Sequence, residues 1–412
     1  MKAIRTFTLG LAALILVAGS LAAQVQVADR ENVKAWITLD TVGTLQALEQ
    51  KNAFNPAGNE YGELAPGFQT AFGNFGMIGK FGRNEEIELV FNMYLSSRNH
   101  PSSTYGNEGY IILHGLPGDQ PALFDRIFEK VDVKVGHFLL GYGDHHLRRT
   151  NNAAAQSNPL IGNFVIDPEL VTIGGEIWSK PGRFNWLVGL SNGTTTEDFA
   201  EGRGTAYHAK LWAYPIEPLR TSISFFRADH SDNPPKANGG SHAQLFSGNR
   251  SGERYAAVWG GGQAPGQILP RGGKDLTAYQ FDATWKDERP LELYASWGLT
   301  EDSDINGTMP GTLPEEWAYW AGDVVWRFNP RIYAAARYSG AQAKMLAGTA
   351  SDGEVARLQV GGGYRLTENM LIKLEYVTQK LDGFVQGDVI SNTQAWRQPE
   401  FSGPVMEVSF SF

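Results

Sequence analysis

The sequence ends with Met406-Glu407-Val408-Ser409-Phe410-Ser411-Phe412, and this stretch is the most informative about the fold. Apolar and polar residues alternate in it, and the last residue is aromatic. A period of two places the apolar side chains on one face of a β-strand and the polar side chains on the other. We therefore expect a strand whose two faces meet different surroundings.

The same alternation recurs upstream, for example in 87–95, 291–299 and 356–364. Alternation alone fits a β-sandwich as well as a β-barrel. The connections discriminate better, because very short ones such as Lys180-Pro181-Gly182 and Asn329-Pro330 alternate with long ones. The long connections lie near 43–67, 142–168, 229–273 and 381–399. Short turns at one end and long loops at the other are typical of a transmembrane antiparallel up-and-down β-barrel.

The strand count is about sixteen, with both ends of the chain on the short-turn side. The range stays at roughly fourteen to eighteen strands, because the 108–115 strand is weak and 229–273 could hide a hairpin near 255–259. Several large aromatic residues fall at strand ends, as the aromatic girdle of such a barrel requires. They are Trp186, Trp285, Trp297, Tyr364 and Tyr376.

The amino terminus predicts an export signal. Lys2 and Arg5 precede an uncharged apolar run from Leu9 to Val17, and small residues follow. This layout is that of a cleaved secretory signal peptide. The run is short for a membrane-spanning helix. We expect cleavage near residue 23, which leaves 24–412 as the barrel.

Composition narrows the function. The chain holds 48 Gly, 11 Trp, 15 Tyr and 22 Phe, and 0 Cys, so no disulfide can stabilise it. Its formal net charge is −9, which argues against a nucleic-acid partner. Loss of Lys2 and Arg5 with the signal would make the charge more negative. No nucleophile elbow, metal-ligand spacing or phosphate-binding loop stands out, so we expect no enzyme activity, no metal and no cofactor.

The final strand resembles the closing strand of Gram-negative outer-membrane β-barrels. In that family the terminal aromatic residues, here Phe410 and Phe412, belong to the signal read by the barrel-assembly machinery. The third external loop in this strand count, 142–168, resembles that of the sixteen-stranded porins, whose third loop folds into the barrel and sets the constriction. The strand from Val131 to Leu140, with Gly136, resembles a stretch of phosphate-selective porin relatives. The resemblance implies an outer-membrane location, contact with lipid and lipopolysaccharide, a homotrimer and small hydrophilic solutes.

The loop 142–168 is mainly basic, which favours anions at a constriction. Arg148 and Arg149 are permanently charged. His145 and His146 add charge below neutral pH, with Asp144 placed to orient one of them. The candidate wall cations are Lys134, Lys210, Arg337, Arg357 and Lys373, and inward carboxylates oppose them at Glu88, Asp132, Asp282, Glu292 and Glu375. The alternative is that 142–168 is simply a solvated loop, or a loop that contacts lipopolysaccharide.

Two other functions stay open at this point. The first is a plugged structural or adhesive surface barrel whose long loops bind a partner, with 229–273 as the candidate segment. The second is a sugar channel, in which inward aromatic residues form a stacking track. The candidates for that track are Tyr94, Trp212, Tyr294 and Tyr333.

Overall fold

The computed structural model describes residues 25–51, 67–96, 104–118, 121–150, 155–193, 205–229, 245–246, 268, 270, 275–287, 290–303, 314–384, 389–390, 393–394 and 400–412. The expected signal segment 1–23 and the suspected hairpin near 255–259 lie outside these ranges. Among the described residues, no helix is both long and apolar enough to cross a membrane.

The fold is an all-β antiparallel barrel with sixteen wall strands, as the sequence predicts. Each strand pairs with its neighbours in the chain, so the order follows the sequence around the wall. The wall strands are β2 (Val33–Gln46), β4 (Gly67–Phe81), β5 (Ile87–Ser96), β6 (Thr104–Leu113), β7 (Val131–Leu139), β8 (Val171–Ser179), β9 (Phe184–Ser191), β10 (Thr205–Ile216), β11 (Leu219–Asp229), β12 (Leu276–Lys286), β13 (Leu291–Asp302), β14 (Glu315–Arg327), β15 (Ile332–Leu346), β17 (Glu354–Arg365), β18 (Met370–Asp382) and β21 (Glu400–Ser411).

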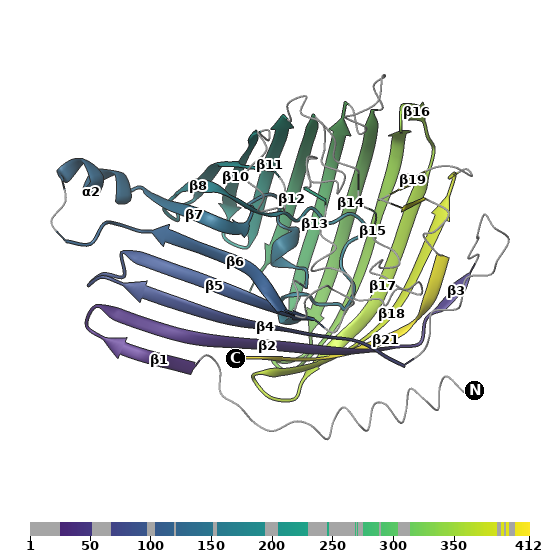
Figure 1. The fold of residues 1–412 in the computed structure, drawn as a ribbon. Helices are drawn as coiled ribbons and strands as arrows, with labels where there is room; N and C mark the ends of the chain where they lie inside the picture. The colour runs from purple at the N-terminus through teal and green to yellow at the C-terminus, as the bar shows by residue number, and fades with distance from the viewer. Residues whose placement is uncertain are drawn as a thin grey trace.

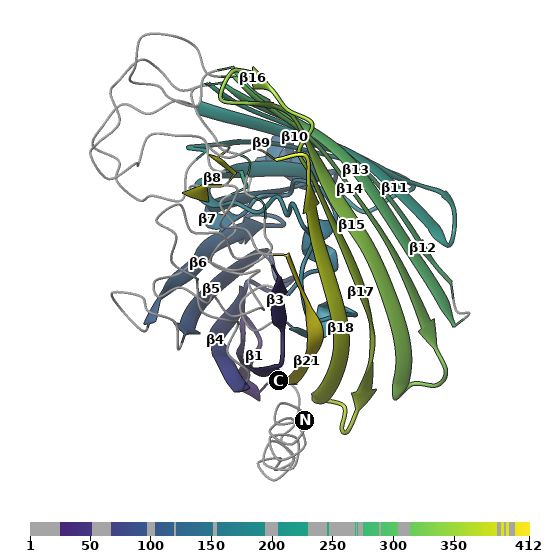
Figure 2. The ribbon, with the colours of Figure 1, turned by 90° about the vertical axis from the view of Figure 1, so that its right-hand side faces the viewer.

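The barrel closes where its last strand meets its first. β21 pairs with β2 from Asp40↔Ser411 to Gln46↔Val405, while its other edge pairs with β18. The terminal Phe412 exchanges two backbone hydrogen bonds with Leu39, of 2.6 and 3.0 Å. Below this seam a short strand, β1 (Val25–Arg30), pairs with the first half of β2. Figures 1 and 2 show β21 lying between β18 and the β2–β4 side of the wall.

Short pieces of strand extend the wall at its long-loop end. β3 (Glu49–Lys51) pairs with the start of β21, and β16 (Thr349–Ala350) forms a tight hairpin with the end of β15. β19 (Val389–Ile390) and β20 (Thr393–Gln394) pair with each other in a separate two-stranded sheet.

The side chains alternate outward and inward in the phase that the sequence shows. On β13, Leu293 and Trp297 are exposed, whereas Glu292, Tyr294 and Ser296 are buried. An apolar outer face and a polar inner face exclude a sandwich, whose apolar faces would meet inside. Trp186, Trp297, Tyr364 and Tyr376 of the predicted girdle are exposed on the outer face, and Trp285 is half-buried.

One connection at the short-turn end differs from the rest. Between β6 and β7 the chain forms α2 (Ala122–Phe128), and none of its residues is buried. The sequence did not predict this helix, because a stretch of this length carries too few turns for a clear period of 3.6. Figure 1 shows it projecting from the barrel beyond the ends of β6 and β7.

Candidate functional site: the loop inside the barrel

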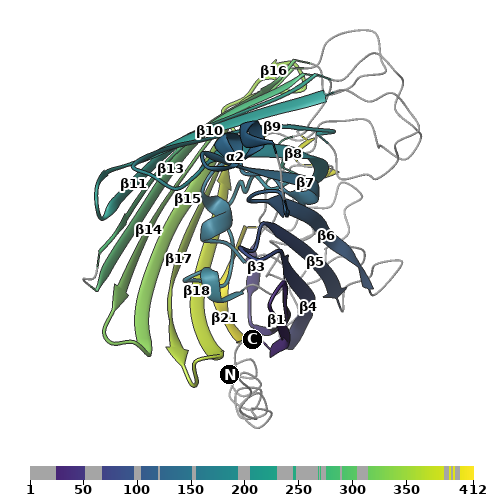
Figure 3. The ribbon, with the colours of Figure 1, turned by 90° about the vertical axis from the view of Figure 1, so that its left-hand side faces the viewer.

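The loop 142–168, between β7 and β8, lies inside the barrel wherever the structure describes it. Its described part contains the 3-10 turns η1 (His145–Leu147) and η2 (Ala155–Ser157). Most of its side chains are buried, including Arg149, Asn158 and Phe164. Figure 3 shows the helical turns lying within the ring of strands. The loop crosses the inner wall from β10 to β18, and a series of hydrogen bonds and ion pairs fixes it there.

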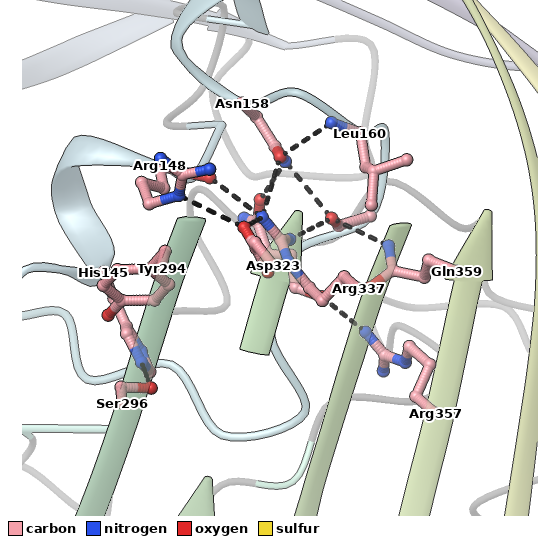
Figure 4. Close-up of polar contacts among 12 residues, drawn as sticks. His145, Arg148, Asn158, Leu160, Tyr294, Ser296, Asp323, Arg337, Arg357 and Gln359 are labelled. Carbon is pink, nitrogen blue, oxygen red and sulfur yellow. Dashed lines mark hydrogen bonds and ion pairs between the residues drawn. The ribbon is translucent and has the colours of Figure 1, made fainter. Parts of the chain in front are cut away.

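Arg148 and Arg337 meet at one carboxylate of the wall. Asp323 on β14 accepts from Arg337 Nε at 2.7 Å and Nη2 at 2.8 Å, and from Arg148 Nε at 3.2 Å. Arg148 also pairs with Glu292 on β13. Charge-assisted hydrogen bonds of this kind are the strong ones in proteins, and both partners here are buried. The loop is therefore held by side chains from neighbouring strands, as Figure 4 shows.

The wall cations also hold the loop backbone. Arg337 Nη1 donates to the Gly162 carbonyl at 3.0 Å, and Arg357 Nη1 donates to the Asn163 carbonyl at 2.8 Å (Figure 4). Lys373 Nζ donates to three loop carbonyls, those of Ala155, Asn158 and Leu160, at 2.7, 3.0 and 2.8 Å. Buried carbonyls of an irregular segment need such donors, since an unsatisfied one costs about 1–3 kcal/mol.

Arg149 is paired within the loop itself. Its Nε lies 2.5 Å from Asp167 Oδ2, and its Nη1 pairs with Glu169. Burial opposes the ionisation of Asp167, but the Arg149 guanidinium holds the pKa of that carboxyl below its ordinary value. The carboxylate beside His145 is also Asp167, at 3.7 Å from Nδ1. Asp144, expected to orient a histidine, does not play that part.

His145 and His146 point to different surroundings, although they are adjacent. The His145 ring stacks on Phe164 with centroids 4.0 Å apart, and its Nε2 lies 2.8 Å from Ser296 Oγ (Figure 4 shows this bond). His146 lines a cavity, and burial lowers the pKa of its ring to about 3. Burial therefore opposes the positive charge that we expected of His146 below neutral pH.

Asp144 is the meeting point of two wall cations. Lys210 Nζ on β10 lies 2.6 Å from Asp144 Oδ1, and Arg220 on β11 pairs with Oδ2 of the same carboxylate. Ser222 Oγ donates to it as well, at 3.0 Å. Two cations thus share one carboxylate on this side of the barrel.

A cavity of about 440 Å³ lies next to this group, on the β6–β11 side of the lumen. Its walls include Lys134, Trp178, Trp212 and Arg220, and its ceiling is the root of the loop, residues 139–141 with His146. Several wall residues lie near the short-turn ends of their strands. The cavity therefore lies in the short-turn half of this side of the barrel.

The long-loop side of the lumen is apolar instead. Val165 and Ile166 of the loop pack in one buried cluster with Phe226, Trp317 and Tyr319 of the wall. Leu245, Phe246 and Ile268 from the β11–β12 connection belong to the same cluster. Backbone hydrogen bonds join the two connections, from Glu169 N to Leu245 O and from Ile268 N to Val165 O, both at 2.8 Å.

The predicted cations thus separate into two groups. Arg148, Arg337, Arg357 and Lys373 gather where the loop meets β13 to β18, and Lys134 and Lys210 lie at the cavity. Arg220 and Asp323 were not predicted, although the inward phase of their strands indicates both. Asp167 and Glu169 were not predicted as partners of Arg149.

The described members of the predicted aromatic track have different surroundings. Tyr294 contacts the loop, with Arg148 over its ring at 5.2 Å and its hydroxyl donating to Asp282 at 2.6 Å. Tyr333 packs beside Leu160 of the loop. Trp212 lines the cavity, and the side chain of Tyr94 lies outside what the structure describes.

A scan against protein-family models finds no match, and no curated protein matches. Solved structures do match along almost the whole chain. OmpF of Salmonella typhi, in complex with daunomycin, is 11% identical with a TM-score of 0.56, and the match covers 94% of this chain and 100% of that one. The anion-selective porin from Comamonas acidovorans is 11% identical with a TM-score of 0.56, covering 92% and 100%. The trimer form of OmpT from Vibrio cholerae is 9% identical with a TM-score of 0.53, also covering 92% and 100%. This chain therefore has the fold of the sixteen-stranded outer-membrane porins.

Proposed function

We propose that the protein is a porin of a Gram-negative outer membrane, through which small hydrophilic solutes and ions diffuse passively. The observation that supports this most directly is the distribution of side chains on the wall, which is apolar outside and polar inside. Apolar side chains such as Leu293 and Trp297 face outward, and charged ones such as Lys210 and Arg337 face inward. A lipid-facing band around a polar interior is the arrangement of a transmembrane channel.

The proposal includes the route to the membrane and the assembly. Residues 1–23 act as a cleaved export signal, and Phe410 and Phe412 present the terminal signal to the barrel-assembly machinery. The mature barrel contacts lipid and lipopolysaccharide. A homotrimer is part of the proposal, and the trimer form of the Vibrio cholerae OmpT supports it by analogy of fold.

The loop 142–168 acts as the constriction in this proposal, with a preference for anions. Its own arginines contribute less to that preference than their number suggests, because Arg148 and Arg149 each pair with two carboxylates. The stronger source is the cavity side, where Lys210 and Arg220 share Asp144. Charges that line a narrow passage select ions of opposite sign.

The test is a planar-bilayer recording of the refolded mature protein in a salt gradient. Discrete, stable current steps are expected, with a reversal potential on the anion side. The Arg148→Ala/Arg149→Ala variant should shift that potential toward cations only slightly, and Lys210→Ala/Arg220→Ala should shift it more. A folded, inserted and silent barrel would contradict the proposal.

A plugged barrel is the second candidate, and the apolar cluster on the long-loop side supports it. Leu245, Phe246 and Ile268 pack against the loop there, and such a cluster excludes water. Shortening the β11–β12 connection, so that these residues are removed, separates the two functions. A plugged barrel would begin to conduct after the deletion, whereas a porin would conduct before and after it.

A further inference from the structure

The cavity on the β6–β11 side has the features of a binding site rather than of a plain water-filled passage. At about 440 Å³ it falls in the size range of small-molecule sites. Its walls combine flat aromatic rings with cationic side chains, and the two kinds are adjacent. Arg220 lies over the Trp212 ring at 6.0 Å, and Lys134 lies over the Trp178 ring at the same distance.

The carboxylates of the cavity are already used by the protein. Glu108 Oε1 accepts from Leu139 N at 3.0 Å, and Glu176 Oε1 accepts from Gly141 N at 2.7 Å. Glu176 also pairs with Lys134 at 2.5 Å. These acids hold the root of the loop, and both carboxyl oxygens of Glu176 are engaged.

The donors of the cavity are less completely used. Lys210 and Arg220 both contact Asp144, and Ser222 Oγ lies between that carboxylate and the buried carboxylate of Asp282, at 3.0 and 3.3 Å. A guanidinium carries five N–H donors in a planar fork. Among the described residues, the contact seen for the Arg220 guanidinium with a carboxylate is that with Asp144. Its remaining donors suit a planar anionic group, and the Trp212 face beside them suits a flat apolar body.

We propose that this cavity binds small organic anions that carry a carboxylate on a flat, apolar ring. The inference deepens the channel function and rests on it for the route by which such a ligand arrives. The ring lies against Trp212 and Trp178, and the carboxylate meets Arg220 and Lys210. A simple inorganic anion lacks the ring contact, and a neutral aromatic compound lacks the charge.

The test uses benzoate as the probe, with the purified full-length mature barrel in detergent and isothermal titration calorimetry. Saturable binding of benzoate is expected, whereas acetate, benzamide and benzylammonium should each bind at least about tenfold more weakly. Arg220→Gln and Trp212→Leu should each weaken benzoate binding by about tenfold. Arg220→Lys, which keeps the charge but loses the fork, should fall between.

The matched controls are Arg83→Gln, in an exposed short turn, and Trp297→Leu, on the outer wall. Both should bind benzoate as the parent does. Equal binding of acetate and benzoate, or equal losses in the controls, would overturn the inference. Bilayer recordings separate it from the channel proposal: conduction without saturable benzoate binding rejects the site alone, and binding without conduction rejects the porin alone.

Discussion

The two sides of the lumen use the same residue types in opposite ways. On the β13–β18 side, cations such as Arg337 and Lys373 are fully buried and donate to the carbonyls and carboxylates that fix the loop. On the β6–β11 side, Lys134 and Arg220 line a cavity. A charged residue inside the barrel therefore fixes the loop on one side, whereas on the other side charged residues also border a cavity.

The largest effect is expected when the loop is detached from the β13–β18 side. Arg337→Met removes the two bonds to Asp323 and the bond to Gly162, and it leaves a buried carboxylate partly uncompensated. Removing one partner of a buried pair typically costs about 3–5 kcal/mol. We expect a lower temperature for the heat-induced mobility shift of the barrel in gel electrophoresis, and noisier single-channel current.

The double variant Arg337→Met/Asp323→Leu is the matched control, because it removes both charges. It should recover part of the lost stability, since a buried apolar pair is tolerated better than a lone charge. A single variant as stable and as quiet as the parent would show that Arg337 does not hold the loop.

The rate of thiol modification can distinguish the two sides. The chain has 0 Cys, so a single introduced cysteine supplies the only thiol that a reagent can modify. Trp212→Cys lies at the cavity, and Tyr294→Cys lies beneath the loop. A charged methanethiosulfonate reagent should modify position 212 at least about tenfold faster, because a site under the loop reacts only after local opening. Mass spectrometry of timed samples measures both rates. Similar rates at the two positions would mean that the loop does not cover its side of the lumen.

Selectivity should also depend on the side that is changed. Asp144→Asn removes the carboxylate that Lys210 and Arg220 share at the cavity, so the ratio of anion to cation permeability should rise several-fold. Glu292→Gln removes a carboxylate from the loop-covered side and should change the ratio less. Reversal potentials in a salt gradient measure both. An equal shift in the two variants would place the ion path across both sides.

For the residues in these predictions, the sequence indicates the direction of the side chain but not its contact partner. Alternation gave the direction of each wall side chain, so Lys210, Arg337 and Lys373 were expected to face inward and do so. Their partners were not predictable. Arg337 meets Asn158, which lies 179 residues away in the chain, and only the register of the closed barrel brings them together. Periodicity shows which face of the wall a strand residue occupies. The loop residue that it contacts depends on the path of the loop through the folded barrel.

The cavity was not predictable from the sequence for a similar physical reason. Arg220 follows the short turn between β10 and β11, and its inward direction is a matter of phase. Its importance arises because Asp144, from the loop, is already shared with Lys210. The sequence gives the number of charged residues. Which of them form ion pairs depends on the folded chain, so the charge left unpaired cannot be read from the sequence.

The smallest expected effect lies outside both sides, at the short-turn rim. Glu85 accepts from Lys34 Nζ at 2.7 Å and Lys80 Nζ at 2.8 Å, and these hydrogen bonds lower its pKa to about 2. A carboxyl whose pKa is lower in the folded protein stabilises it above its ordinary pKa, and this contribution is lost as the pH falls toward 2. Glu85→Gln should therefore lower the heat-shift temperature slightly at pH 7, and the difference should vanish near pH 2. Because the group is exposed, high salt should also reduce the difference at pH 7. A difference that persists at pH 2 would assign the effect to the turn backbone, where Glu85 has a φ of 58°, and not to charge.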